Sequence, residues 1–172
     1  MNRFLLIAFV FLGLQNTALA QHEGEIFSIY LVRHAEKEAE AKDPGDPGLS
    51  FCGELRAQAL VTILGDVSLE NIYSTPFERT LKTASPIAES RQLEIKIYDP
   101  SGLKEFSKLL LDTQQDALVV GHSNTTAVLA GLLASKNEEA FDEDIYDRLY
   151  QVVISGKQAR LNLLHQTFDC EP

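Results

Sequence analysis

The stretch IFSIYLVRHAEK, from Ile26 to Lys37, decides the fold of this 172-residue chain. It begins with apolar, β-branched and aromatic residues, which are typical of a strand buried on both faces of a parallel sheet. It then changes abruptly to Arg33 and His34. Open α/β sheets bind ligands at the carboxyl ends of their strands, so the stretch predicts a site at that edge. Arg33 offers donors for phosphate or carboxylate, and His34 a nitrogen that can act as nucleophile, base or ligand. A solvated charge cluster would explain this stretch alone equally well.

Alternating strands and helices are expected after this stretch. Apolar or β-branched runs predict strands at 69–74, 93–98 and 116–121, and helical spacing predicts helices at 55–64, 76–88, 103–112 and 127–133. Thr75 is placed to cap the second helix, Pro76 to begin it, and Pro86 to kink or split it. Residues 149–154 and 159–164 flank a short turn and predict a β-hairpin. The pattern predicts an α/β fold, a three-layer α/β/α sandwich around a mainly parallel sheet.

Four residues are expected to converge at the carboxyl edge of this sheet: Arg33, His34, Arg79 and His122. Arg79 falls in the first turn of a predicted helix, where a cation is favourable if an anion lies between it and the helix terminus. His122 directly follows the predicted strand at 116–121. Two guanidinium groups and two imidazoles suit a phosphate group, whereas a divalent metal would be repelled by the arginines. A nucleophile at Ser123 would need a G-x-S-x-G elbow, and GHSNT at 121–125 lacks the second glycine.

The first twenty residues predict a secretory signal peptide. Arg3 gives a short positive region, an apolar run extends from Phe4 to Leu14, and Ala18-x-Ala20 is a small-residue cleavage pattern. The run is too short to span a bilayer, so we expect export without membrane insertion and one domain over residues 21–172. Removing Arg3 from the 15 basic residues leaves 14 against 25 acidic ones. An acidic surface of this size argues against nucleic acid as a partner.

The two cysteines, Cys52 and Cys170, both lie outside the predicted signal peptide. In an oxidising compartment an even count favours one disulfide, which would join the C-terminal tail to the early part of the domain. Two free thiols are the alternative.

Three blocks of sequence resemble the motifs of the histidine phosphatase superfamily, the phosphoglycerate-mutase-like proteins. They are LVRHAE at 31–36, YSTPFERTLKTA at 73–84 and GHSNT at 121–125, in the order of the family. The resemblance implies that His34 attacks phosphorus to form a phosphohistidine, which water then hydrolyses. It also implies that Arg33 and Arg79 bind the phosphoryl oxygens, that His122 donates a further hydrogen bond, and that no metal or organic cofactor is needed. The substrate would be a small phosphorylated molecule, and the short chain resembles the small phosphatases more than the mutases.

Two positions depart from this family pattern. Ala35 stands in place of the signature glycine, and Ser123 in place of the aspartate that one branch uses as general acid. After the third predicted strand the acid candidates are Asp99 and Glu105, with Glu36 more distant. Asp99 is favoured because it leaves the strand directly, although aspartate before proline is also common in turns.

The predicted function is an exported phosphomonoesterase. A protein phosphohistidine phosphatase is one alternative, because an imidazole leaving group needs no strong acid. A non-catalytic module that binds a phosphorylated or sulfated ligand is another, although simple anion binding would need only the two arginines.

Overall fold

The computed structural model describes residues 25–168 and 170, so the predicted signal peptide at 1–20 lies outside the described residues. Six strands form one sheet: β1 (Ile26–Arg33), β2 (Asn71–Ser74), β3 (Ile95–Ile97), β4 (Ala117–Gly121), β5 (Arg148–Ser155) and β6 (Gln158–His165). Four helices accompany them: α1 (Phe51–Ile63), α2 (Glu78–Arg91), α3 (Leu103–Thr113) and α4 (Thr126–Ala134). Within the described part of the chain, no helix is long and apolar enough to cross a membrane.

The sheet has the strand order β3-β2-β4-β1-β5-β6. The first four of these strands are parallel, β5 is antiparallel to β1, and β5 and β6 form the predicted hairpin. Arg33 pairs in register with Gly121, and Ser74 pairs with Val120. The carboxyl ends of β1, β2 and β4 therefore lie level with one another, as the sequence predicts.

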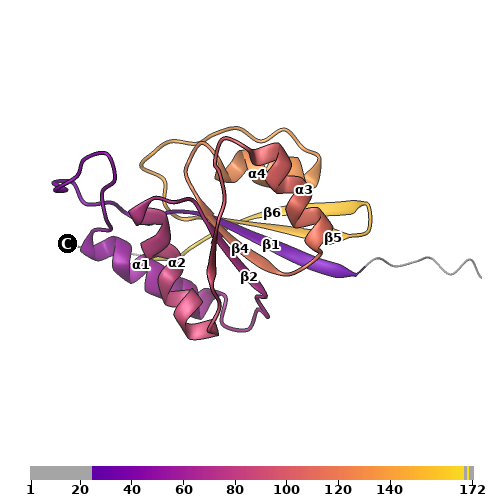
Figure 1. Cartoon of the computed structure of the whole chain (residues 1–172), viewed down its shortest axis with the longest axis horizontal. Coiled ribbons are helices and arrows are strands. Elements are labelled where there is room, and N and C mark those ends of the chain that lie inside the picture. Colours follow the sequence, from indigo (N-terminus) through magenta and orange to yellow (C-terminus); the bar gives the residue numbers. More distant parts are fainter. Residues whose placement is uncertain (1–24, 169, 171–172) are drawn as a thin grey trace, which may run out of the picture.

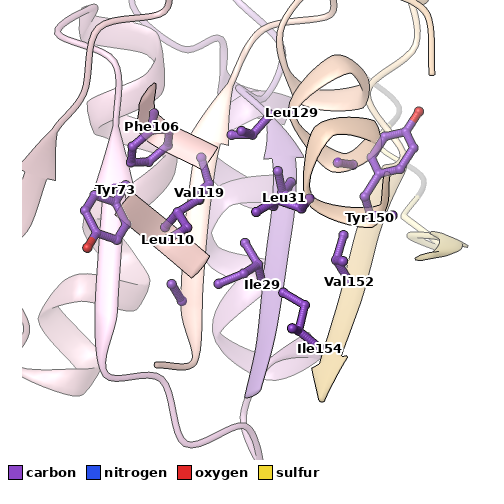
Figure 2. Packing of buried hydrophobic residues seen from close by; sticks show 14 of the residues in the cluster. Ile29, Leu31, Tyr73, Phe106, Leu110, Val119, Leu129, Tyr150, Val152 and Ile154 are labelled. Carbon is purple, nitrogen blue, oxygen red and sulfur yellow. The ribbon is translucent and has the colours of Figure 1, made fainter. Parts of the chain in front are cut away.

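Helices cover both faces of this sheet (Figure 1), with α1 and α2 packed on one side and α3 and α4 on the other. Successive side chains of β1 alternate between the two cores, because neighbouring residues of a strand point to opposite faces. Ile29 and Leu31 belong to the core beneath α3 and α4, which Figure 2 shows together with Val119 of β4. Val32 belongs to the core beneath α1 and α2. The three-layer α/β/α sandwich is confirmed.

The start of α2 differs from the prediction. The helix begins at Glu78, two residues after Pro76, and its N-cap residue is Phe77, whose side chain has no hydrogen-bonding group. The carboxylate of Asp46, from the loop before α1, instead accepts hydrogen bonds from the Glu78 amide at 2.9 and 3.1 Å. A remote carboxylate therefore replaces the local cap expected from Thr75.

Of the two effects expected of Pro86, a kink or a split, the split is wrong, because α2 is one helix that continues to Arg91. Ala84 and Ile87, on either side of the proline, are fully buried in the core beneath α1 and α2. Packing on both sides of Pro86 holds both halves of α2 on one face of the sheet. This packing stabilises the helix by more than the loss of the one hydrogen bond that proline cannot make.

The predicted disulfide is confirmed. Cys52 in the first turn of α1 is bonded to Cys170, with a Cα–Cα distance of 5.7 Å and a sequence separation of 118. Next to this bond, the guanidinium of Arg56 lies 4.6 Å from the ring centroid of Phe168 and forms an ion pair with Glu36 at 2.6 Å. The C-terminal tail is thereby joined to α1 and to the segment that follows β1.

Candidate active site

The backbone at the end of β1 is fixed by three other segments. The His34 amide donates to the carbonyl of Gly121 at 2.9 Å, and the Ala35 amide donates to Oγ1 of Thr83 on α2 at 2.9 Å. The Ser50 amide donates to the carbonyl of Glu36 at 2.9 Å. Arg33 and His34 are each only 3% exposed. Both side chains are therefore held at the carboxyl edge by a rigid backbone.

The ring of His34 has a defined tautomer. Nδ1 lies 2.8 Å from the carbonyl oxygen of Ala35, and because a carbonyl only accepts, Nδ1 must carry the proton. Burial lowers the pKa of His34 to about 3, and the nearby charges of Arg33 and His122 act in the same direction. The imidazole is therefore neutral at physiological pH, with its lone pair on Nε2. A neutral imidazole with a free nitrogen is the form that can attack phosphorus.

His122 lies beside His34, with the two ring centroids 5.4 Å apart. Its Nε2 is 3.0 Å from Oγ1 of Thr75, and its amide donates to Oγ1 of Thr125 at 2.9 Å. Burial lowers the pKa of His122 to about 4, with further contributions from the charges of Arg79 and Arg33. Both histidines are thus neutral in the free protein, and a bound anion would favour their protonated forms.

Arg33 is held by the loop that precedes β5. One terminal nitrogen of its guanidinium donates to the carbonyls of Glu143 and of Ile145, the latter at 3.1 Å. Cζ of the same guanidinium lies 4.2 Å from the ring centroid of Tyr146. Its Nε is buried, and within residues 25–168 and 170 it has no hydrogen-bond partner. An unpaired buried guanidinium N–H is costly, so this atom indicates that an external anion completes the site.

Arg79 lies in the first turn of α2, as the sequence predicts. Its guanidinium is 4.6 Å from the ring centroid of Phe77 and 3.3 Å from Oδ1 of Asp46. The same carboxylate accepts from the Glu78 amide, so an acidic side chain lies between the arginine and the positive end of the helix. This end of α2 is therefore an anion-binding position.

A pocket of about 540 Å³ brings these groups together. It is lined by the four residues expected to converge and by eight others: Arg33, His34, Lys37, Phe77, Arg79, Pro100, Ser101, His122, Ser123, Asn124, Thr125 and Glu143. The convergence of Arg33, His34, Arg79 and His122 follows from the level carboxyl ends of β1 and β4 and from the start of α2.

Asp99 is not among the residues that line this pocket. Its carboxylate accepts from the amide of Ser101 at 2.8 Å and from the hydroxyl of Ser101 at 2.7 Å, and these two bonds lower the pKa of Asp99. The side chain lines a separate hollow of about 800 Å³ beside β3 and α3. The turn chemistry of aspartate before proline therefore determines where this carboxylate lies, and the structure does not bring it to His34.

Among the eight other residues that line the pocket, two are charged, Lys37 and Glu143, and neither was expected to converge with the four. Glu143 lies in an acidic segment without helical or strand periodicity, and Lys37 follows three residues after His34. Lys37 carries a weak sequence signal because it continues the charged stretch after β1, whereas nothing in the local pattern distinguishes Glu143 from its acidic neighbours.

No group of three or more histidine, cysteine, aspartate or glutamate side chains among residues 25–168 and 170 is arranged to hold a metal ion. The polar groups that line the pocket are predominantly donors and cations, which suit an anion.

The fold and the pocket define an α/β protein that presents two arginines and two histidines to an anion at the carboxyl edge of its sheet. The family description of the histidine phosphatase superfamily (branch 1) matches residues 29–112, a range that holds three of these four residues. The match covers slightly less than half of the chain, so the chain is similar to this family over residues 29–112.

Individual proteins are similar to this chain as well. A phosphoserine phosphatase 1 from Hydrogenobacter thermophilus is 41% identical over 71 residues, which are 39% of this chain and 34% of that protein's length. The solved alpha-ribazole phosphatase from Shigella flexneri has a TM-score of 0.67 and 20% identity, covering 84% of this chain and 100% of that one. The protein histidine phosphatase SixA, solved with tungstate, has a TM-score of 0.67 and 14% identity, covering 80% and 96%. These two structures show a shared fold.

Proposed function

We propose that this chain is an exported phosphomonoesterase that hydrolyses phosphate esters through a phosphohistidine on His34, without a metal ion. The observation that carries the proposal is the state of His34. Its Nδ1–H is bound to the Ala35 carbonyl, and its neutral ring lies in a pocket with two arginines. A site that only binds anions has no need of a neutral nitrogen held in this way.

In the proposed reaction, Nε2 of His34 forms a bond to phosphorus as the ester P–O bond breaks. The leaving oxygen takes a proton and departs as an alcohol. Arg33 and Arg79 bind the equatorial phosphoryl oxygens and stabilise charge that develops in the transition state. A water molecule then attacks the phosphohistidine, the P–N bond breaks, and His34 returns with inorganic phosphate as product. His122 donates a hydrogen bond to the phosphoryl group in both steps.

Export is part of the proposal. It is supported by the signal-peptide pattern at 1–20 and by the disulfide between Cys52 and Cys170, since disulfides persist mainly in oxidising compartments. N-terminal sequencing of the protein recovered from outside the cytoplasm should begin at Gln21. A start at Met1 would contradict export by cleavage.

A protein phosphohistidine phosphatase is the second candidate. It is favoured by the position of Asp99, whose carboxylate lies outside the pocket and is bound to Ser101. An imidazole leaving group departs without a strong acid, so such a reaction does not need this carboxylate. A phosphohistidine peptide as substrate, compared with an alkyl phosphate, distinguishes the two functions.

The direct test is hydrolysis of p-nitrophenyl phosphate by the mature protein with EDTA present. A nitrophenolate leaving group needs little protonation, so the test does not depend on the identity of the acid. We expect turnover that survives EDTA and is lost in His34→Ala. The matched control is His165→Ala, because His165 lies on β6, outside the pocket, with its imidazole bound to Asp147.

Three outcomes would count against the proposal. Loss of turnover in EDTA that zinc or magnesium restores would contradict the metal-independent mechanism. Full turnover by His34→Ala would contradict the phosphohistidine. Absence of turnover in a protein that still binds vanadate or phosphate would support the non-catalytic binding module.

A further inference from the structure

Glu143 is the only carboxylate among the described residues that line the pocket. Its Oε2 lies 3.6 Å from Nζ of Lys37, which also lines the pocket. The side chain of Glu143 is 78% exposed, whereas His34 is 3% exposed. The carboxylate therefore lies at the mouth of the pocket, and the imidazole lies at its base.

The backbone around Glu143 is anchored to the site. The carbonyls of Glu143 and Ile145 both accept from the guanidinium of Arg33. The ring of Tyr146 lies over the same guanidinium and 6.1 Å from the ring of His34, measured between centroids. The segment that carries the carboxylate is thus held by the arginine expected to bind the phosphoryl group, so its position is coupled to the reacting centre.

The geometry of phosphoryl transfer sets where a proton donor must lie. The attacking and leaving atoms are roughly in line across phosphorus. With His34 at the base of the pocket, the leaving oxygen points toward the mouth. Glu143 lies on that side, whereas Asp99 does not line the pocket and its carboxylate is bound to Ser101.

We propose that Glu143 is the general acid of this site and that its substrates are alkyl phosphate monoesters. The inference rests on the proposed function. The carboxylic acid gives its proton to the ester oxygen as the P–O bond breaks and the bond from phosphorus to His34 forms. The resulting carboxylate then takes a proton from the water that attacks the phosphohistidine, which restores the acid and balances the cycle.

A bound phosphoryl dianion provides the electrostatic reason for a protonated carboxyl group at this position. Two negative charges at close range repel each other, so the neutral form of the Glu143 carboxyl group is favoured when the dianion occupies the pocket. In the free protein, the carboxylate forms an ion pair with Lys37. Alkyl alcohols are poor leaving groups and gain most from protonation, which is why the acid points to alkyl esters.

The test compares two leaving groups in Glu143→Gln. We expect kcat/KM for glycerol 2-phosphate to fall by about 100-fold or more, the usual contribution of general acid catalysis. For p-nitrophenyl phosphate the change should stay within about threefold, because nitrophenolate leaves without a proton. The alkaline limb of the kcat/KM profile for the alkyl ester should also disappear. Retained aryl turnover shows that the variant is folded.

Two control variants separate proton donation from other effects. Glu139→Gln changes an exposed carboxylate of the same segment that does not line the pocket, and it should leave both substrates unaffected. Lys37→Met removes the partner of Glu143 and keeps the carboxyl group. It should not reproduce the loss that is specific to the alkyl ester.

Each remaining outcome overturns the inference in a recognisable way. Equal losses on both substrates would assign Glu143 to binding. If kcat/KM of Glu143→Gln for glycerol 2-phosphate is unchanged, a phosphohistidine substrate becomes the better hypothesis. An alkyl-specific loss in Lys37→Met would assign the effect to the lysine. Absence of aryl turnover in the wild-type protein would refute the proposed function, and the general acid with it.

Discussion

Acidification from pH 7.5 to pH 5 should leave His34 neutral. Burial lowers the pKa of this imidazole to about 3, so at pH 5 only about 1% of the folded protein would carry the proton. An imidazole with the ordinary pKa of about 6.5 would be roughly 97% protonated at the same pH. The nucleophile is therefore available across the whole mildly acidic range.

The same shift makes the folded protein less stable in acid. The folded pKa of His34 lies below the unfolded one, so the unfolded chain binds the proton more readily, and stability is lost as the pH falls from about 6.5 toward 3. Between pH 7.5 and pH 5 the unfolded histidine takes up its proton and the folded one does not. This difference amounts to about 2 kcal/mol for a side chain that is almost fully buried.

Two assays measure these effects. The ring Cε1–H resonances, followed by NMR, should show His34 unchanged between pH 8 and pH 5, and vanadate should raise its midpoint because an anion favours the imidazolium. In urea unfolding, the free energy of unfolding of the wild-type protein should fall by about 2 kcal/mol more than that of His34→Gln between pH 7.5 and pH 5. A midpoint near 6.5 for His34 in the free protein, or equal losses in the two proteins, would refute the reasoning.

Three further predictions follow from the fold. Replacing Cys52 and Cys170 by serine opens a loop of about 118 residues and should lower the free energy of unfolding by roughly 2–5 kcal/mol in urea, whereas a change below 1 kcal/mol would contradict the role of the bond. In Gly53→Ala the new Cβ would lie 2.1 Å from the carbonyl oxygen of Glu36. We expect the free energy of unfolding to fall by about 1–3 kcal/mol despite the better helix propensity of alanine, as measured by thermal unfolding with Gly65→Ala as the comparison. Asp99→Asn should change kcat/KM for glycerol 2-phosphate by no more than about twofold, and a larger loss would restore Asp99 as the acid.

The site residues that lie at the ends of strands and helices could be predicted from the sequence. Arg33 and His34 follow a buried run, His122 follows another, and Arg79 begins a helix. Their convergence needs only the rule that parallel strands end at one edge, together with the order of strands and helices. The disulfide could also be predicted, because the chain has two cysteines, which allow one pairing, and a signal-peptide pattern that indicates an oxidising compartment.

The parts that depend on loop conformation could not be predicted. Asp46 caps α2 from a loop more than thirty residues away in sequence, and no local sequence pattern predicts such a contact. Asp99 has the right chemistry and follows the right strand, but its own turn directs the carboxylate toward Ser101. Glu143 has several acidic neighbours, and long-range contacts of its segment, such as the hydrogen bonds to Arg33, bring it to the pocket.

The central claim is that His34 becomes covalently phosphorylated. The most direct measurement is rapid acid-free quenching of the protein with an aryl phosphate in EDTA, followed by mass spectrometry of peptides kept at alkaline pH. We predict one phosphoryl group on the peptide that contains His34, stable in alkali, lost in acid, and absent from His34→Ala. Turnover with the phosphoryl group on Ser123, or turnover by His34→Ala at the wild-type rate, would contradict the account.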